Sequence, residues 1–147
     1  MQVRMRRQLP NPPAANEAVS RSMRGNVAKN TKPEVTLRRL LRLAGFPGYR
    51  LHWRKAPGRP DIAYPGRKIA IFVNGCFWHR CPHCEPPLPK SHSEFWQRKF
   101  DLNAERDERK VRELESAGWR VVVAWECRIR DDPASVIAEL TGLLKSR

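Results

Sequence analysis

The chain shows helical and strand periodicity in turn from about residue 30 onward. Apolar side chains first recur at helical spacing, at Val35, Leu37, Leu40, Leu41 and Ala44. Thr31 and Glu34 have the pattern of a capping box, and Pro33 stands near the first helical turn. Because Gly45 is a stop signal, the pattern predicts a helix over residues 31–44.

Three stretches with strand character follow, over residues 49–53, 61–64 and 68–73. Pro65 and Gly66 form a turn signal between the last two. The third stretch is almost continuously apolar and rich in β-branched residues, which is typical of a strand buried on both faces. We therefore expect residues 68–73 to form the central strand of a sheet.

The second half of the chain predicts one long helix, a strand and a last helix. The long helix covers residues 93–117, is capped by its first residue and ends at Gly118. Residues 119–125 predict a second buried strand that Cys127 closes, and the last helix starts at Asp132. A strand, a long helix and a strand imply a crossover, so at least one pair of strands should be parallel. The predicted fold class is α/β, a mixed sheet flanked by helices on both faces.

The N-terminal residues differ from the rest in composition. Residues 1–18 carry several arginines and prolines with little apolar pattern, which predicts a flexible basic extension. Residues 20–26 are basic and small, and they form either a disordered linker or a segment that becomes ordered on DNA. The total of 147 residues, 40% of them hydrophobic, fits one core, so we expect residues 19–147 to form a single domain.

The charge of the chain is strongly positive. Lys and Arg number 29 against 15 Asp and Glu, which gives a formal net charge of +14. Such a surface attracts polyanions, of which nucleic acid is the commonest, although a ribosomal protein or a membrane-surface binder has the same balance. No apolar run approaches the roughly 20 residues that span a bilayer, and the N-terminal residues lack the apolar centre that is typical of a secretory signal. We expect a cytoplasmic protein that does not bind membranes.

Four cysteines form a candidate metal site. Cys76, Cys81 and Cys84 lie close together in a turn-rich segment, and Cys127 must reach them through the fold. In a reducing compartment such spacing favours soft metal ligation over disulfides. Four thiolates make a closed, structural zinc site, with His83 as an alternative to one of them. Buried thiols without a ligand are the remaining interpretation.

A second group of residues has the chemistry of a hydrolytic site. Asp61 precedes a strand and is a natural Mg²⁺ ligand, although Pro-Asp pairs are more often turn formers. His79 lies outside the zinc spacing, so its imidazole is free to accept a proton from water. Asp107 could orient this histidine or be one charge on a solvated helix face. Glu34 could be an acid beside the metal or a capping residue, and the sequence by itself favours the simpler role for both.

Three aromatic residues stand near these groups. Phe77 and Trp78 are adjacent in the cysteine-rich segment, and Trp96 lies in the first turn of the long predicted helix. Aromatic wedges enter the base stack in proteins that distort DNA, but packing in the core is the usual role of a tryptophan. Both interpretations stay open on the residues alone.

Five ordered motifs resemble one enzyme family. They are Gly58-Arg59-Pro60-Asp61, Phe72-Val73-Asn74-Gly75-Cys76-Phe77-Trp78-His79, Glu94-Phe95-Trp96, Asn103 to Asp107, and Gly118-Trp119-Arg120-Val121 with Trp125-Glu126-Cys127. Together they closely resemble the Vsr family of very-short-patch-repair DNA mismatch endonucleases, over about residues 20–130. The resemblance implies a restriction-endonuclease-like fold, a structural zinc knuckle, and a nick on the 5′ side of the thymine in a T:G mismatch left by deamination of 5-methylcytosine.

The resemblance also implies roles for single residues. Asp61 matches the catalytic aspartate that binds Mg²⁺, and Val73 matches a position that binds the metal through its backbone carbonyl. His79 matches the catalytic histidine, which Asp107 supports, and Glu34 matches an acidic residue nearby. The remaining matches are the intercalating aromatics Phe77, Trp78 and Trp96, and the segment that clasps the minor groove, which includes Met23 and Arg24.

Two departures from the family pattern concern the site. Asn74 stands where family members have His or Asp, which bears on how the metal or the water is positioned. The second half of the knuckle, Cys81-Pro82-His83-Cys84, also has a His-rich version, so the identity of one zinc ligand is open.

The expected partner is double-stranded DNA with a T:G mismatch, and a mismatch-repair protein is a candidate second partner. We expect a monomer that is associated with the nucleoid in the bacterial cytoplasm. Two rival functions stay open: a sequence-specific restriction nuclease of the same fold, and a non-catalytic zinc-containing DNA-binding module.

Overall fold

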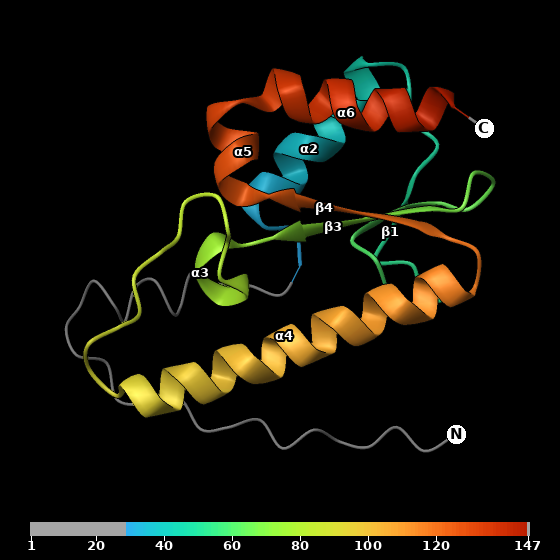
Figure 1. Ribbon diagram of the computed structural model, residues 1–147. Helices are drawn as coiled ribbons and strands as arrows, with labels where there is room; N and C mark the ends of the chain where they lie inside the picture. Colours follow the sequence, from blue (N-terminus) through green and yellow to red (C-terminus); the bar gives the residue numbers. More distant parts are fainter. Residues whose placement is uncertain (1–28, 147) are drawn as a thin grey trace.

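A four-stranded sheet forms the centre of the molecule in the computed structural model, which describes residues 29–146 (Figure 1). The strands are β1 (Arg50–Leu51), β2 (Ile62–Tyr64), β3 (Ile69–Asn74) and β4 (Arg120–Trp125), in the spatial order β1-β2-β3-β4. β1 and β2 are antiparallel, as are β2 and β3, whereas β3 and β4 are parallel. The sheet is therefore mixed, as the sequence predicts.

Helices cover both faces of this sheet (Figure 1). One face carries α2 (Lys32–Leu43), α5 (Glu126–Asp131) and α6 (Pro133–Lys145). The long helix α4 (Ser93–Ser116) crosses the other face and connects β3 to β4, which explains why these two strands are parallel. The short helix α3 (Cys76–His79) follows the end of β3 directly.

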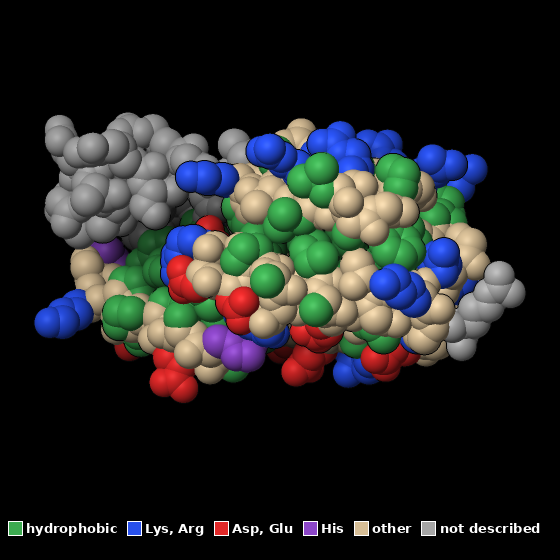
Figure 2. Space-filling view, turned by 90° about the horizontal axis from the view of Figure 1, so that it is seen from above, with side chains coloured by type: hydrophobic (Ala, Val, Ile, Leu, Met, Phe, Trp, Pro, Cys, Tyr) green, Lys and Arg blue, Asp and Glu red, His purple; other side chains and the backbone are tan. Residues whose placement is uncertain are grey.

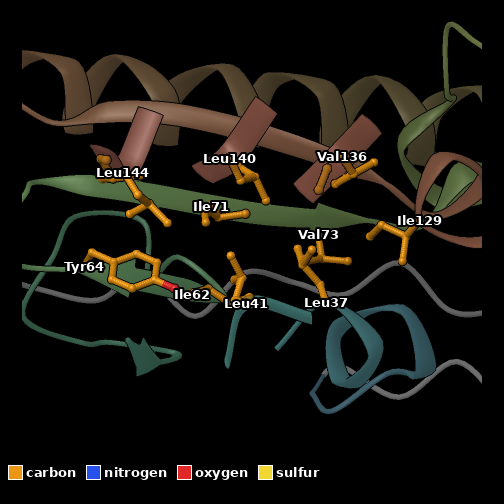
Figure 3. Packing of buried hydrophobic residues seen from close by; sticks show 12 residues of the cluster. Leu37, Leu41, Ile62, Tyr64, Ile71, Val73, Ile129, Val136, Leu140 and Leu144 are labelled. Atoms are coloured by element: carbon orange, nitrogen blue, oxygen red, sulfur yellow. The ribbon is translucent and has the colours of Figure 1, made fainter. Parts of the chain in front are cut away.

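Two hydrophobic cores fill the layers. The larger one joins the sheet to α2, α5 and α6, and Figure 3 shows Leu37, Ile71, Val73 and Leu140 pointing into it from these elements. The smaller one lies under α4 and includes Phe72, Leu114 and Trp119. All six residues of β3 are buried, which confirms the expected central strand.

Lys and Arg side chains are not concentrated in the middle of the surface over α6. Figure 2 shows hydrophobic and neutral atoms over the middle of this face, with Lys and Arg side chains mainly toward its margins. Within residues 29–146, no helix combines the length and apolar character that crossing a membrane requires. The predicted extension over residues 1–18, and Met23 and Arg24, lie outside the described residues.

Several local predictions differ from the structure. β1 has only two residues, and β4 is only half-buried apart from Ala124, because it is the edge strand. Cys127 does not close β4, since the chain turns into α5 at Glu126. At the start of α2, Thr31 makes no side-chain capping hydrogen bond. The residue before α4 is His92, so Ser93 begins the helix without capping it.

Candidate active site and metal centre

A cleft of about 660 Å³ opens where β3 ends, between α2, α3 and α4. It is lined by the residues for which the sequence predicts catalytic or Mg²⁺-binding roles, namely Glu34, Asp61, Val73, Asn74, His79 and Asp107. These residues come from the start of α2, the residue before β2, the end of β3, the end of α3 and the middle of α4. The fold thus brings together groups that are up to 73 positions apart in the chain, from Glu34 to Asp107.

Asp61 is held in the wall of this cleft by the main chain of the neighbouring strand. The N–H of Val73 donates to Asp61 Oδ2 over 2.8 Å. Burial raises the pKa of Asp61 to about 6, the Val73 N–H opposes this shift, and the nearby charge of Glu34 adds to it. Because burial disfavours the charged carboxylate, a cation bound beside it would stabilise the charged form strongly.

His79 and Asp107 form a close pair across the cleft. His79 Nδ1 lies 2.5 Å from Asp107 Oδ2, and both side chains are about three-tenths exposed. Asp107 lines the cleft together with Asn103, Arg106 and Lys110, which lie on the same face of α4. Asn103 strengthens this arrangement by donating to the carbonyl of Trp78 over 3.2 Å. The expectation of a solvated helix face for Asp107 is therefore wrong.

Glu34 is the most deeply buried acid among the described residues, with 3% of its surface exposed. Its Oε2 atom accepts hydrogen bonds from the N–H of Asn30 and from Arg38 Nη2, each over 3.2 Å. It also lies 3.4 Å from His52 Nε2. Glu34 therefore pins the segment before α2, but it does not close the capping box with Thr31 that the pattern predicts.

The four cysteines converge at the same, carboxyl end of the strand pair β3 and β4, next to the cleft. Their sulfur atoms lie within 4.8 Å of one another, and Cys76, Cys81 and Cys127 are buried while Cys84 is exposed. All four are free thiols. They meet because β3 and β4 are parallel neighbours, so the residues just after the two strands lie side by side. The Cys127 N–H donates to Cys76 Sγ over 3.3 Å, which ties the two ends together.

The polar surroundings of these thiols favour a thiolate at one position. Burial raises the pKa of Cys76 and of Cys127. Burial acts in the same direction on Cys81, but the N–H groups of Cys84 and His83 outweigh it and lower the pKa of Cys81 below its usual value. His83 thus contributes its backbone, over 3.3 Å to Cys81 Sγ, and its ring packs edge-on against Trp125. The donor set that the fold assembles is therefore four sulfurs.

The aromatic residues form one cluster beside the cleft. The ring of Phe77 lies 5.2 Å from Trp78, 5.4 Å from Trp96 and 5.3 Å from Phe100, measured between centroids. Trp96 is only 4% exposed, whereas Phe77 and Trp78 are half-buried. In this conformation Trp96 packs as a core residue behind the two partly exposed rings. Lys99 Nζ lies 5.2 Å from the Trp78 ring centroid, so a cation borders the outer ring.

The proteins to which this chain is similar are DNA-cleaving enzymes. The family model described as "DNA mismatch endonuclease Vsr" matches residues 14–85. The type II nicking enzyme V.XorIIP of Xanthomonas oryzae pv. oryzae is 44% identical over 104 residues, which cover 71% of this chain and 76% of that protein. The DNA mismatch endonuclease Vsr of Escherichia coli K12 is 38% identical over 112 residues, which cover 76% and 70%.

The chain belongs to the Vsr family of DNA mismatch endonucleases. This confirms the family that the five motifs indicate and makes the protein a DNA endonuclease. It also sets aside the non-catalytic zinc module as a rival. The cleft and the thiol cluster described above are thus features of a Vsr-type endonuclease.

Two residues near the cleft of this Vsr-family chain are absent from the predicted set. Lys110 lines the cleft one turn beyond Asp107, and its position on the same helix face was a usable signal. His52 contacts both Glu34 and Asp61. It follows β1, which pairs antiparallel with β2, and only that strand register places it beside Asp61. No local pattern in the sequence reveals such a register.

Proposed function

We propose that the protein is a Mg²⁺-dependent, strand-specific endonuclease of very short patch repair. It nicks one DNA strand on the 5′ side of the thymine in T:G mismatches that arise from deamination of 5-methylcytosine. The observation that carries this proposal is the convergence of Asp61 and the paired His79 and Asp107 on one cleft of a Vsr-family chain. The Escherichia coli relative is named a DNA mismatch endonuclease, which supports the choice of a mismatch as substrate.

Asp61 and the backbone carbonyl of Val73 are the proposed ligands of Mg²⁺. The N–H and C=O of a strand residue point to the same side of the strand, and the Val73 N–H points at Asp61. The Val73 carbonyl therefore faces the same side as the carboxylate, and two oxygens with water and phosphate suit this hard cation. When bound, Mg²⁺ would stabilise the negative charge that develops on the phosphate.

His79 is the proposed base that activates water. With Nδ1 directed at Asp107, the ring presents Nε2 as the other nitrogen, which in the neutral form accepts a proton. As the water oxygen bonds to phosphorus and the bond to the leaving oxygen breaks, the water proton passes to His79. Asp107 holds the ring and stabilises the imidazolium that forms. The Asn74 amide and the Glu34 carboxylate border the same cleft and would orient the water and the charged groups around it.

The four thiols are the proposed ligands of a structural zinc ion. Cys76, Cys81, Cys84 and Cys127 supply four sulfurs, which leaves no open coordination position for substrate. Such an ion would brace the ends of β3 and β4, and with them α3 and its His79. Zinc in this role holds the scaffold and takes no part in strand cleavage.

Recognition of the mismatch is proposed to depend on the aromatic cluster. Phe77 and Trp78 are partly exposed and would enter the base stack first, with Trp96 moving out of its packed position to complete the wedge. A wobble pair costs less to unstack than a Watson–Crick pair, which favours this site over matched DNA. Met23 and Arg24 are proposed to contact the minor groove, in a domain that spans residues 19–147 and follows the flexible extension over residues 1–18.

A sequence-specific nicking enzyme is the second candidate function. The relative from Xanthomonas oryzae carries the name type II nicking enzyme, and it is 44% identical to this chain over 104 residues. The two functions differ in what the enzyme requires of its substrate, a mispair or a particular sequence.

One assay separates them. Labelled duplexes with T:G, T:A or C:G at one position, each in several sequence contexts, are incubated with enzyme and Mg²⁺. A single nick beside the thymine of T:G alone supports mismatch repair. Cleavage of fully paired duplexes in one context at a comparable rate contradicts it and supports the second candidate. Asp61→Asn protein is the control that excludes a contaminating nuclease.

A further inference from the structure

His52 has a left-handed backbone conformation next to the cleft. Its φ is 45°, in a region where histidine, like asparagine and aspartate, is found more often than other residues with a side chain. The backbone N–H of His52 donates to the carbonyl of Asp61 over 3.1 Å, which fixes the two residues opposite each other. The left-handed turn thus directs the imidazole toward the two acids of the cleft wall.

Both ring nitrogens of His52 face carboxylates. Nδ1 lies 3.7 Å from Asp61 Oδ1, and Nε2 lies 3.4 Å from Glu34 Oε2. Nε2 is buried and makes no hydrogen bond within the described part of the chain. Glu34, His52 and Asp61 can each offer a ligand atom within 4.8 Å of the others. Two carboxylates and an imidazole therefore lie together, and all three side chains can offer an electron pair to a cation.

The contacts of Asp61 leave one of its oxygens for His52. Asp61 Oδ2 accepts from the Val73 N–H, so Oδ1 is the oxygen that faces His52 Nδ1. A carboxylate oxygen and an imidazole nitrogen are both atoms that divalent cations accept as ligands.

We propose that His52 Nδ1 is a nitrogen ligand for the divalent cation on Asp61, with Glu34 as the carboxylate partner of the other ring nitrogen. Two ligands that bind one ion at about 2.1 Å each can be 3.7 Å apart, as these two atoms are. A histidine on a metal usually directs its second nitrogen at a carboxylate, as Nε2 does toward Glu34. This inference rests on the proposed function, because it shares Asp61 with it, and it adds a nitrogen to an otherwise all-oxygen site.

The nitrogen changes which cations the site accepts. Mg²⁺ strongly favours oxygen ligands, whereas imidazole suits transition metals. The site should therefore hold Mn²⁺ more tightly than an all-oxygen site does. The surplus affinity for Mn²⁺ should disappear with the imidazole.

Electron spin echo spectroscopy of bound Mn²⁺ tests the inference directly, because it detects nitrogen bonded to the ion. The full-length protein with its thiol site filled by zinc is titrated with Mn²⁺ alone. The parent protein should show nitrogen coupling, and His52→Asn should lose it together with at least tenfold of its Mn²⁺ affinity. Asparagine is chosen because it tolerates the left-handed backbone, and thermal melting checks that the variant is folded. His92→Asn is the matched control, because His92 is an exposed histidine with a left-handed backbone (φ 54°) outside the cleft, and it should leave both readings unchanged.

The outcomes separate this inference from the proposed function. If the parent shows no nitrogen coupling while Asp61→Asn weakens Mn²⁺ binding, His52 is not a ligand and the Mg²⁺ role of Asp61 stands. Coupling that persists in His52→Asn also overturns the inference. If coupling is present and His52-dependent but T:G duplexes are not nicked, the metal site stands and the proposed substrate is wrong.

Discussion

His79 Nδ1 lies 2.5 Å from Asp107 Oδ2, and this contact joins the last residue of α3 to the middle of α4. A short helix that follows the central strand would otherwise have little to fix its final side chain. The pair thus defines which imidazole nitrogen faces the cleft, and it provides the most direct test of the proposed chemistry.

Replacing Asp107 by Asn should slow nicking more than it weakens DNA binding. The amide keeps the shape but offers an N–H where the carboxylate accepted, so the ring adopts the wrong tautomer and the imidazolium loses its counter-charge. We expect the single-turnover rate to fall on the order of 10²- to 10⁴-fold, with DNA affinity nearly unchanged. Asp101→Asn, an exposed position on the same helix, is the control. Equal rates for parent and Asp107→Asn would exclude the proposed pair.

The pH dependence of stability should reveal the burial of Asp61. Its pKa is about 6 in the folded protein against an ordinary value of 3.8, so the folded state binds the proton more tightly than the unfolded state. The contribution of Asp61 to folding is therefore most favourable below pH 4, declines as the pH rises to about 6, and stays low above that.

In buffer without divalent cations, Asp61→Asn should be more stable than the parent at pH 7, by up to roughly 3 kcal/mol. Urea unfolding at several pH values measures this difference, which should shrink toward zero at pH 4. A difference that does not change with pH would show that the carboxyl group titrates normally.

Loss of one thiol should release the proposed zinc ion. Cys127→Ser removes the ligand that α5 supplies, so we expect a fall from one zinc per chain to much less, and a melting temperature lower by about 10 °C or more. Metal analysis and thermal melting measure the two effects. His83→Ala should keep its zinc, because the His83 ring packs on Trp125 and stands outside the sulfur cluster. Loss of zinc in His83→Ala, together with retention of zinc in Cys84→Ser, would identify His83 as the fourth ligand.

Gly58 should tolerate no side chain. Its φ is +74°, and a Cβ atom there would stand 2.9 Å from Lys110 Cβ, so the loop before Asp61 packs directly on α4. We expect Gly58→Ala to lower the free energy of unfolding by about 2 kcal/mol, since strain and overlap add. Gly66→Ala is the control, because nothing lies within 4 Å of its added atom. Equal unfolding free energies for the two variants would contradict this account.

Trp78, the outer ring of the aromatic cluster, should contribute to the preference for T:G over T:A duplexes. Trp78→Ala removes a stacking surface worth about 1–3 kcal/mol, so the preference for T:G over T:A duplexes should fall roughly tenfold or more. Trp78→Phe should recover part of it. Competition between labelled duplexes measures the preference, and Leu88→Ala serves as a control at an exposed apolar position. A preference that survives in Trp78→Ala would assign recognition to other residues.

The sequence predicts helices and strands well where the apolar residues follow a single spacing, that of a strand or that of a helix. The apolar run that became β3 and the long helical pattern of α4 are local signals, and their order implies the parallel pairing with β4. The end of β4 is different. Nothing in Trp125-Glu126-Cys127 marks the change from strand to α5, and Cys127, in the first turn of α5, packs against Cys76 and Cys81 from distant parts of the chain.

The site was harder to predict than the fold. Asp107 and Glu34 have simpler local explanations, and the rotation of α4 and the burial of α2 decide against them. The place of His52 depends on the register of two short strands, which involves only two residue pairs. Residue types indicate which chemistry is available, whereas the pairing of side chains depends on contacts between distant elements.

The bond from the Val73 N–H to Asp61 has a practical consequence for engineering the enzyme. Because the donor belongs to the main chain, swapping Val73 for another apolar residue leaves the carboxylate anchored. Proline, which has no N–H, would delete that anchor, but in the buried strand β3 it would also disturb the sheet. The position of the carboxylate is therefore insulated from apolar substitutions at residue 73.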